Sequence, residues 1–132
     1  EPMLSHVFIG TNDPERATNF YRPIMEALGY PLKFIDQERG WAVWTSPGGA
    51  RPYFLVGRPF DGEPALAGNG QMIALLAPSR AAVDEVYALA MSGGGRDDGP
   101  PGPRPQYHGD YYGAYFRDPD GCKLCVCRHD PD

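Results

Sequence analysis

An internal repeat constrains the fold of this chain more than any other feature of its sequence. A shift of 66 residues superposes the two halves, because His6 falls on Met72, Asp13 on Ser79 and Tyr21 on Tyr87. In each half an apolar strand pattern is followed by a capped helical stripe that ends at glycine. One unit of this size cannot bury its hydrophobic face alone, so we expect two copies to build one fold.

The first copy reads as a strand followed by a helix. Side chains alternate between two faces over Leu4–Ile9, which is typical of a strand. Asp13 and Pro14 suit a helix cap and the first helical position. Apolar residues at helical spacing then run to a glycine at position 29, where we expect the helix to end. Pro23 falls inside this stretch and predicts a kink or a split of the helix.

The second copy repeats this order. Met72–Leu76 is an apolar strand pattern, Ser79 is a helix cap, and the glycines at 93–95 stop the helix. The inner stripe of that helix is expected to consist of Ala82, Val83, Val86, Tyr87 and Ala90.

Strands separated by turns follow each helix. They are expected at about Trp41–Thr45, Pro52–Gly57, Tyr111–Arg117 and Lys123–Arg128. Asp118–Gly121 has the sequence of a type I turn between the last two. The long segment 92–110 is rich in glycine and proline, and we interpret it as a binding loop or lid. The pattern predicts an α+β fold in which two copies of one module follow each other.

Charge and composition exclude several classes of partner. The net charge is −5, and the 12 Lys and Arg residues are scattered, so we expect neither nucleic acid nor an anionic membrane as a partner. No apolar run is long enough to span a bilayer. The three cysteines lie between positions 122 and 127, too close together to staple a fold, and indicate reduced thiols in a cytoplasmic protein.

Short sequence motifs in both halves point to one known family. They are His6-Val7, Phe20-Tyr21, Leu28-Gly29, Gly68-Asn69-Gly70, Val83-Asp84, Gly93-Gly94 and Asp118-Pro119-Asp120-Gly121. With them the chain resembles the glyoxalase / bleomycin-resistance protein / extradiol dioxygenase (vicinal-oxygen-chelate) superfamily. The resemblance implies an α+β fold of tandem βαβββ modules that form an open, curved eight-stranded cleft. It also implies a single domain over residues 3–132, with half-modules at 3–58 and 70–129 and a linker at 59–69. It also implies a homodimer, as do open sheet edges.

The resemblance further implies a metal site, and this chain departs from it. Catalytic members hold a divalent metal with a His on the first strand, a His on the first strand of the second half and a Glu after the last turn. Those positions fall on His6, Met72 and Cys125. A thioether is a poor ligand for zinc, magnesium or manganese, and a thiol is a poor substitute for a carboxylate base. We therefore expect no cofactor; if a metal is held, it is a divalent ion or copper.

Two interpretations of the sulfur-containing positions stay open. His, Met and Cys are ligand types that copper(I) prefers, and Cys127 follows Cys125 on the same strand face. A soft-metal or thiol-redox site is one interpretation. The other is that buried Met and Cys fill the core, which is their commonest role.

Aromatic residues supply the candidate ligand-binding positions. Tyr107, His108 and Tyr111 border the expected lid, and Trp44 lies on an expected strand. Three functions compete on these grounds. The first is a protein that binds a small molecule, aromatic or not, without metal catalysis. The second is a metal-dependent lyase or dioxygenase of the same superfamily, and the third is a soft-metal or thiol-redox protein.

Overall fold

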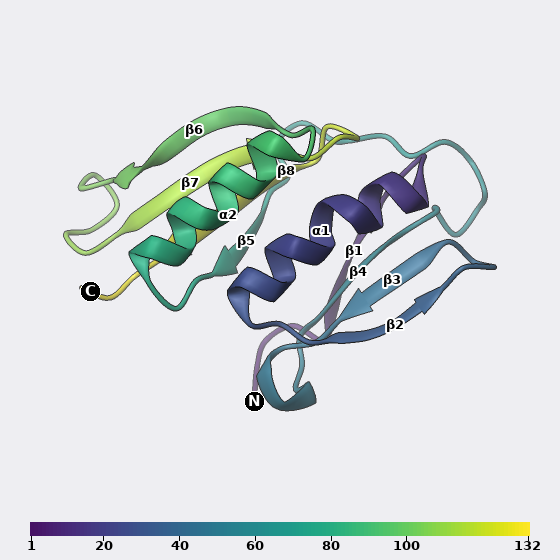
Figure 1. Ribbon diagram of the computed structural model, residues 1–132, viewed down its shortest axis with the longest axis horizontal. Coiled ribbons are helices and arrows are strands. Elements are labelled where there is room, and N and C mark those ends of the chain that lie inside the picture. Colours follow the sequence, from purple (N-terminus) through teal and green to yellow (C-terminus); the bar gives the residue numbers. More distant parts are fainter. The chain divides into compact units, whose positions relative to one another are not determined.

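The computed structural model describes residues 1–132 and divides into two compact units, Glu1–Ala67 and Gly68–Asp132. Each unit holds one α-helix and one four-stranded sheet (Figure 1). The boundary lies inside the segment 59–69 that the sequence suggests as a linker. Each unit follows the βαβββ order, so the predicted α+β class with two such modules is confirmed. Neither helix has the length and apolar character that crossing a bilayer requires.

The first unit contains a mixed sheet with the strand order β1-β4-β3-β2. Its elements are β1 (His6–Gly10), α1 (Pro14–Leu28), β2 (Leu32–Asp36), β3 (Trp41–Trp44), the short helix η1 (Pro47–Gly49) and β4 (Tyr53–Gly57). β1 and β4 pair in parallel, and the other two pairings are antiparallel. The parallel pair is joined by the crossover that α1 begins, as a parallel connection requires.

Helix α1 begins and ends where the sequence predicts. The Asp13 side chain accepts a hydrogen bond from the backbone N of Arg16, and Pro14 is the first helical residue. Gly29 ends the helix in the left-handed conformation with φ of 79°. Pro23 lies inside the helix, but α1 is one continuous element, so the predicted split is wrong. Side chains of α1 pack onto β3 and β4, where the Tyr21 and Phe54 rings lie 5.2 Å apart.

The second unit has the same arrangement, with the strand order β5-β8-β7-β6. Its elements are β5 (Ile73–Leu76), α2 (Arg80–Ser92), β6 (Arg96–Pro103), β7 (Tyr112–Arg117) and β8 (Lys123–Arg128). Ser79 caps α2, since its Oγ accepts from the backbone N of Ala82 at 3.0 Å. The turn at Asp118–Gly121 closes with a 2.8 Å bond from Gly121 N to Asp118 O, as predicted.

The expected lid is a strand. β6 occupies Arg96–Pro103, inside the segment interpreted as a loop, and pairs with β7 through two register shifts. Three prolines fit there because β6 is an edge strand, whose outward-facing residues need no N–H donor. Only the stretch from Arg104 to Tyr111 remains a loop between β6 and β7.

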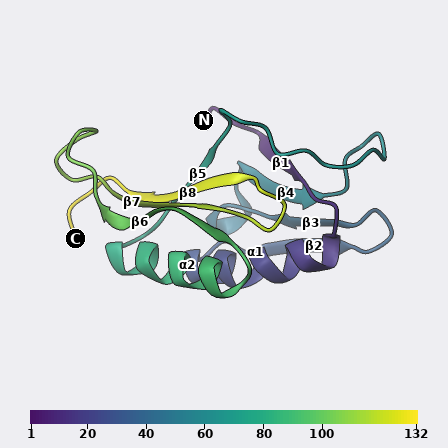
Figure 2. The same ribbon diagram turned by 90° about the horizontal axis from the view of Figure 1, so that it is seen from above.

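Helix α2 covers one face of its sheet (Figure 2). On that side Val83 and Val86 of α2 are fully buried, as are Phe116 of β7 and Leu124 and Val126 of β8. Strand side chains alternate between faces, so Tyr115, Cys125 and Cys127 point to the opposite face. We call this the open face of the second unit, and it includes Ala74 and Leu76 of β5, which are exposed.

Candidate functional site

A cluster of rings and thiols occupies one end of the open face. Tyr111 precedes β7, and its buried side chain packs with the buried thiols Cys125 and Cys127. Tyr115 of β7, four residues further along the chain, packs against the same group. We call these four residues, with the loop and terminal residues Tyr107, His108 and His129 that contact them, the ring–thiol cluster.

Rings from two separate segments meet in this cluster. The Tyr107 and Tyr111 rings are 5.1 Å apart edge to face, and His108 lies 5.6 Å from Tyr111. His129, just after β8, stacks on His108 at 5.2 Å and meets the edge of Tyr111 at 5.4 Å. The histidines also share a 3.0 Å contact between His108 Nε2 and His129 Nδ1. Such edge and offset arrangements are those that aromatic rings prefer.

The thiols lie within reach of several hydroxyl, thiol and imidazole groups. Tyr111 Oη is 3.3 Å from Cys125 Sγ and 2.8 Å from Tyr115 Oη. Cys127 Sγ is 3.7 Å from His129 Nε2. Cys125, Cys127 and His129 are each two residues apart, at the end of β8 and just after it. Their side chains therefore point to the same face. This row leads from a buried sulfur to an exposed imidazole.

The two neighbouring thiols differ in acidity. A hydrogen bond from Cys127 and others from Tyr111 and Tyr115 lower the pKa of Cys125 to about 7, against the desolvation that burial causes. The bond to Cys125, together with burial, raises the pKa of Cys127 well above its ordinary value. Burial and the bond to Cys125 likewise raise the pKa of Tyr111. These hydrogen bonds and the nearby charge of Arg104 thus favour the ionised form of Cys125 over that of Cys127.

Positive charge borders the cluster. The Arg104 guanidinium lies 5.6 Å from the Tyr115 ring centroid and donates to the carbonyls of Pro100, Gly102 and Pro103. Lys123 Nζ lies at the same 5.6 Å distance from that ring.

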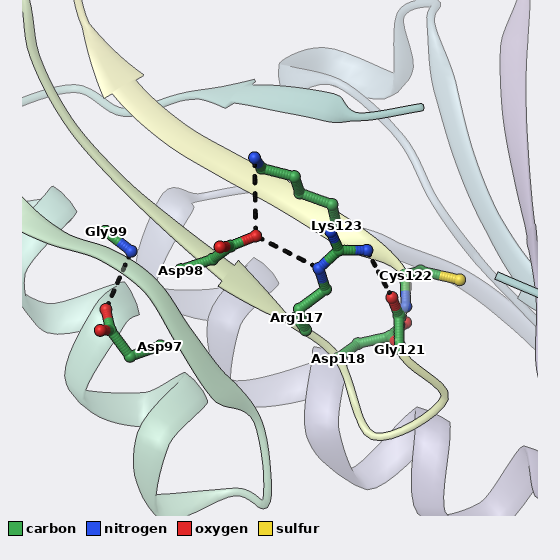
Figure 3. Close-up of polar contacts among 8 residues, drawn as sticks. All are labelled: Asp97, Asp98, Gly99, Arg117, Asp118, Gly121, Cys122 and Lys123. Atoms are coloured by element: carbon green, nitrogen blue, oxygen red, sulfur yellow. Dashed lines mark hydrogen bonds and ion pairs between the residues drawn. The ribbon is translucent and has the colours of Figure 1, made fainter. Parts of the chain in front are cut away.

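An ion-pair network lies next to it on the same sheet. Asp98 of β6 pairs with Arg117 at 3.2 Å and with Lys123 at 3.5 Å, and Arg117 also donates to Gly121 O (Figure 3). One carboxylate thus serves two cations, and a positive charge is left over beside Tyr115 in a chain whose net charge is −5.

The predicted ligand-binding residues fall in two places. Tyr107, His108 and Tyr111 come together as expected from their positions in the chain, and Tyr107 is 60% exposed. Trp44 lies in the first unit and is 1% exposed, near Phe54 on the face that α1 covers. Its ring therefore has no surface to offer a ligand.

His129 is a member of the cluster that the sequence patterns did not single out. It is exposed, and it also joins His108 to Cys127. Its spacing of two residues from Cys127 is the signal that could have placed it on the same strand face.

The three positions that correspond to family metal ligands do not make a suitable donor set. His6 lies on β1 in the first unit, where its Nδ1 is 2.8 Å from Ser5 Oγ. Met72 precedes β5 with a half-exposed thioether, and the sulfur of Cys125 is hydrogen-bonded within the ring–thiol cluster. No three His, Cys, Asp or Glu side chains are grouped so that they could hold a metal ion. A thioether and a bonded thiol do not fit the hard divalent metals of the family.

A groove of about 660 Å³ lies in the first unit, between the start of α1 and the β2–β3 hairpin. Trp41 and Arg22 line it together with Glu15 and Asp36. Its lining carries both signs of charge, and none of the candidate residues named from the sequence lies in it.

Comparison with known proteins places the chain in a family. The family model described as Glyoxalase/Bleomycin resistance protein/Dioxygenase superfamily matches residues 3–126. A comparison with curated proteins finds no match.

Solved structures agree with this family match. A glyoxalase/bleomycin resistance protein from Albidiferax ferrireducens T118 is 34% identical with a TM-score of 0.85, covering 96% of this chain and 99% of its own. A glyoxalase/bleomycin resistance protein/dioxygenase family enzyme from Burkholderia phytofirmans PsJN shares the fold at 18% identity and a TM-score of 0.69, covering 96% of this chain and 98% of its own. This chain therefore belongs to the glyoxalase/bleomycin resistance protein/dioxygenase superfamily.

Proposed function

We propose that this protein binds a small planar aromatic molecule at the ring–thiol cluster without the help of a metal. The observation that carries the proposal is the convergence of Tyr107, His108, Tyr111 and His129 from a loop and from the end of β8. Three of these side chains are exposed, so their rings have free area on which a planar ligand can stack.

The charge beside the cluster favours an acidic ligand. Arg104 donates hydrogen bonds to carbonyl groups and lies beside the Tyr115 ring, and Arg117 and Lys123 share the carboxylate of Asp98. A planar aromatic carboxylate would place its ring against Tyr107 and its charge toward Arg104. Charge-assisted hydrogen bonds of this type are about twice as strong as neutral ones.

The departure from the family's metal ligands supports binding over metal catalysis. A divalent metal that polarises a carbonyl needs ligands that hold it firmly. The thioether of Met72 is a poor ligand for zinc, manganese or iron(II). The sulfur of Cys125 is engaged by Tyr111 and is a poor substitute for the family's carboxylate base.

The test is a calorimetric titration with planar aromatic carboxylates against the wild-type protein and two variants. Tyr107→Ala removes an exposed ring of the cluster and should weaken binding at least tenfold. Tyr53→Ala is the matched control, since its ring lies in the first unit under the guanidinium of Arg51 at 3.9 Å. The proposal fails if no aromatic compound binds, or if Tyr53→Ala weakens binding as much as Tyr107→Ala does.

A further inference from the structure

Strand β6 has an irregular shape that stacking on the exposed rings does not explain. Its pairing with β7 shifts register twice, between Asp97 and Gly99 and between Gly99 and Gly102. We propose that this strand is a rigid cradle for the guanidinium of Arg104, and that Arg104 selects ligands with a carboxylate over neutral ligands of the same shape. This selection rests on the proposed function, because it acts on the aromatic ligand that the ring–thiol cluster binds.

Three carbonyl groups from one short segment hold the guanidinium. Arg104 Nη1 donates to the carbonyl of Gly102 at 3.0 Å and to that of Pro103 at 3.3 Å. Its Nη2 donates to the carbonyl of Pro100 at 2.8 Å. The ring of each proline in this segment fixes the backbone φ angle, so the segment has fewer conformations than an ordinary chain. The position of the guanidinium is therefore set before a ligand arrives.

Two glycines of β6 make room for this side chain. A Cβ at Gly102 would lie 3.3 Å from Arg104 Nη1, and one at Gly99 would lie 3.4 Å from Nη2 and 3.1 Å from the Tyr115 ring. Gly99 also has a φ of 147°, which other residues rarely adopt. Its N–H donates to Asp97 Oδ1 at 2.9 Å, so that carboxylate supports the chain at the register shift (Figure 3). The register shifts therefore fall where the strand leaves space for Arg104.

The cradle leaves part of the guanidinium free to bind a ligand. An arginine side chain has more N–H donors than these three carbonyls engage, since one on Nε and a second on Nη2 remain. Nε and Nη2 are neighbouring nitrogens, and a carboxylate can accept from two such donors at once. The carbonyl partners of Arg104 are uncharged, and the carboxylate of Asp98 on β6 is engaged by Arg117 and Lys123. The positive charge of Arg104 is therefore available to an anionic ligand.

Arg104 lies beside the ring–thiol cluster through both its side chain and its backbone. The guanidinium carbon is 5.6 Å from the centroid of the Tyr115 ring. The backbone N of Arg104 donates to Tyr111 O at 3.2 Å, and its carbonyl accepts from Tyr107 N at 2.9 Å. The same residue thus presents a charge next to one ring of the cluster and closes the loop that carries the exposed ring of Tyr107. The ring surface and the charge are parts of one site.

The number of donors predicts a contrast between arginine and lysine at position 104. A lysine ammonium keeps the positive charge, but it has only three donors, and the cradle presents three carbonyls. Arg104→Lys can therefore satisfy the cradle and has no donor left for the carboxylate of a ligand. A loss of selection with the cradle still occupied distinguishes a residue that selects ligands from one that only supports the loop.

The experiment is a calorimetric titration of the full chain with naphthoate and with naphthamide, which share a ring system and differ in charge. The wild-type protein should bind naphthoate about ten- to a hundredfold more tightly than naphthamide, as expected for hydrogen bonds to a charged group. In Arg104→Lys this ratio of affinities should fall about tenfold, while naphthamide binds as it does to the wild type.

Two glycine variants test the cradle itself. Gly102→Ala places a methyl group against Nη1 and displaces the guanidinium, so its ratio of affinities should lie between those of the wild type and Arg104→Lys. Gly109→Ala is the matched control in the neighbouring loop, because no atom lies within 4 Å of a Cβ at that position. Its ratio should equal that of the wild type.

Equal binding of naphthoate and naphthamide to the wild-type protein would overturn the selection by Arg104 and leave the proposed aromatic binding in place. An unchanged ratio in Arg104→Lys would also overturn it. So would the loss of both ligands in that variant, because Arg104 would then only support the loop. If neither compound binds to the wild-type protein, the proposed function and the selection fail together.

Discussion

Replacing Asp118 should destabilise the protein more than its place in a surface turn would suggest. Asp118 is 3% exposed, and its Oδ1 accepts hydrogen bonds from the backbone N of Asp120 at 3.0 Å and of Cys122 at 2.9 Å. In the variant Asp118→Ala both amide groups lose their acceptor. A hydrogen bond to a charged group contributes about 1.5–3 kcal/mol. Because Asp120 and Cys122 are only half-buried, we take the lower value for both bonds and expect a loss of about 3 kcal/mol.

Urea denaturation at equilibrium measures this loss. For a small protein, 3 kcal/mol corresponds to a fall in the midpoint of about 1–3 M. Asp118→Asn is the matched control, because its amide oxygen still accepts both bonds without the charge, and it should cost about 1 kcal/mol. A loss below 1 kcal/mol for Asp118→Ala would refute the assignment of the turn's stability to this carboxylate. Equal losses for both variants would show that charge, and not the acceptor, matters.

Four further outcomes follow from the structure. Ser79→Ala removes the cap of α2 and should lower the free energy of unfolding by about 1 kcal/mol in a denaturant titration, with Ser92→Ala nearly neutral. Phe116→Ala empties a fully buried position and should cost about 3–5 kcal/mol by the same measurement. Tyr111→Phe removes a donor to Cys125 and should raise the pKa of that thiol, as read from thiolate ultraviolet absorbance; an unchanged pKa would contradict the bond. Burial and hydrogen bonds raise the pKa of Tyr111 above 10.0, so Tyr111 ionises at a lower pH in the unfolded chain than in the folded protein. The free energy of unfolding should therefore fall as the pH rises through 10, and Tyr111→Phe should lessen that fall.

The metal content of the protein is a separate prediction. Protein purified without chelators should carry no divalent metal near one per chain by elemental analysis. One metal per chain that is lost in both His6→Ala and Cys125→Ala would contradict the metal-free function.

Local signals in the sequence predicted much of the fold. Asp13 and Ser79 cap the two helices, and Asp118–Gly121 forms its turn, because these residues satisfy backbone groups within a few positions. The 66-residue repeat predicted two units of the same type, which the sheet orders bear out.

Elements that depend on pairing or packing with another strand or helix were harder to predict from the sequence. β6 has the sequence RDDGPPGP, which carries no strand pattern and is held by pairing with β7. Pro23 did not split α1, since the helix packs on β3 and β4 and this packing outweighs a lost backbone bond.

The candidate site was predictable in part for the same reason. Tyr107, His108 and Tyr111 are close in sequence, so their proximity follows from the chain. The thiolate environment of Cys125 depends on the pairing of β7 with β8, which brings Tyr115 opposite it. Trp44 could not be excluded in advance, because alternation on a strand does not say which face a helix will cover.

The measurement that tests the central claim most directly is an NMR titration that follows the imidazole C–H signals of the three histidines with a planar aromatic carboxylate. His108 and His129 lie in the ring–thiol cluster, and His6 lies on β1 in the first unit. We predict saturable shifts for the first two signals and none for His6. Shifts of His6 alone, or of no histidine while the compound binds, would contradict the claim that the ligand site lies in the second unit.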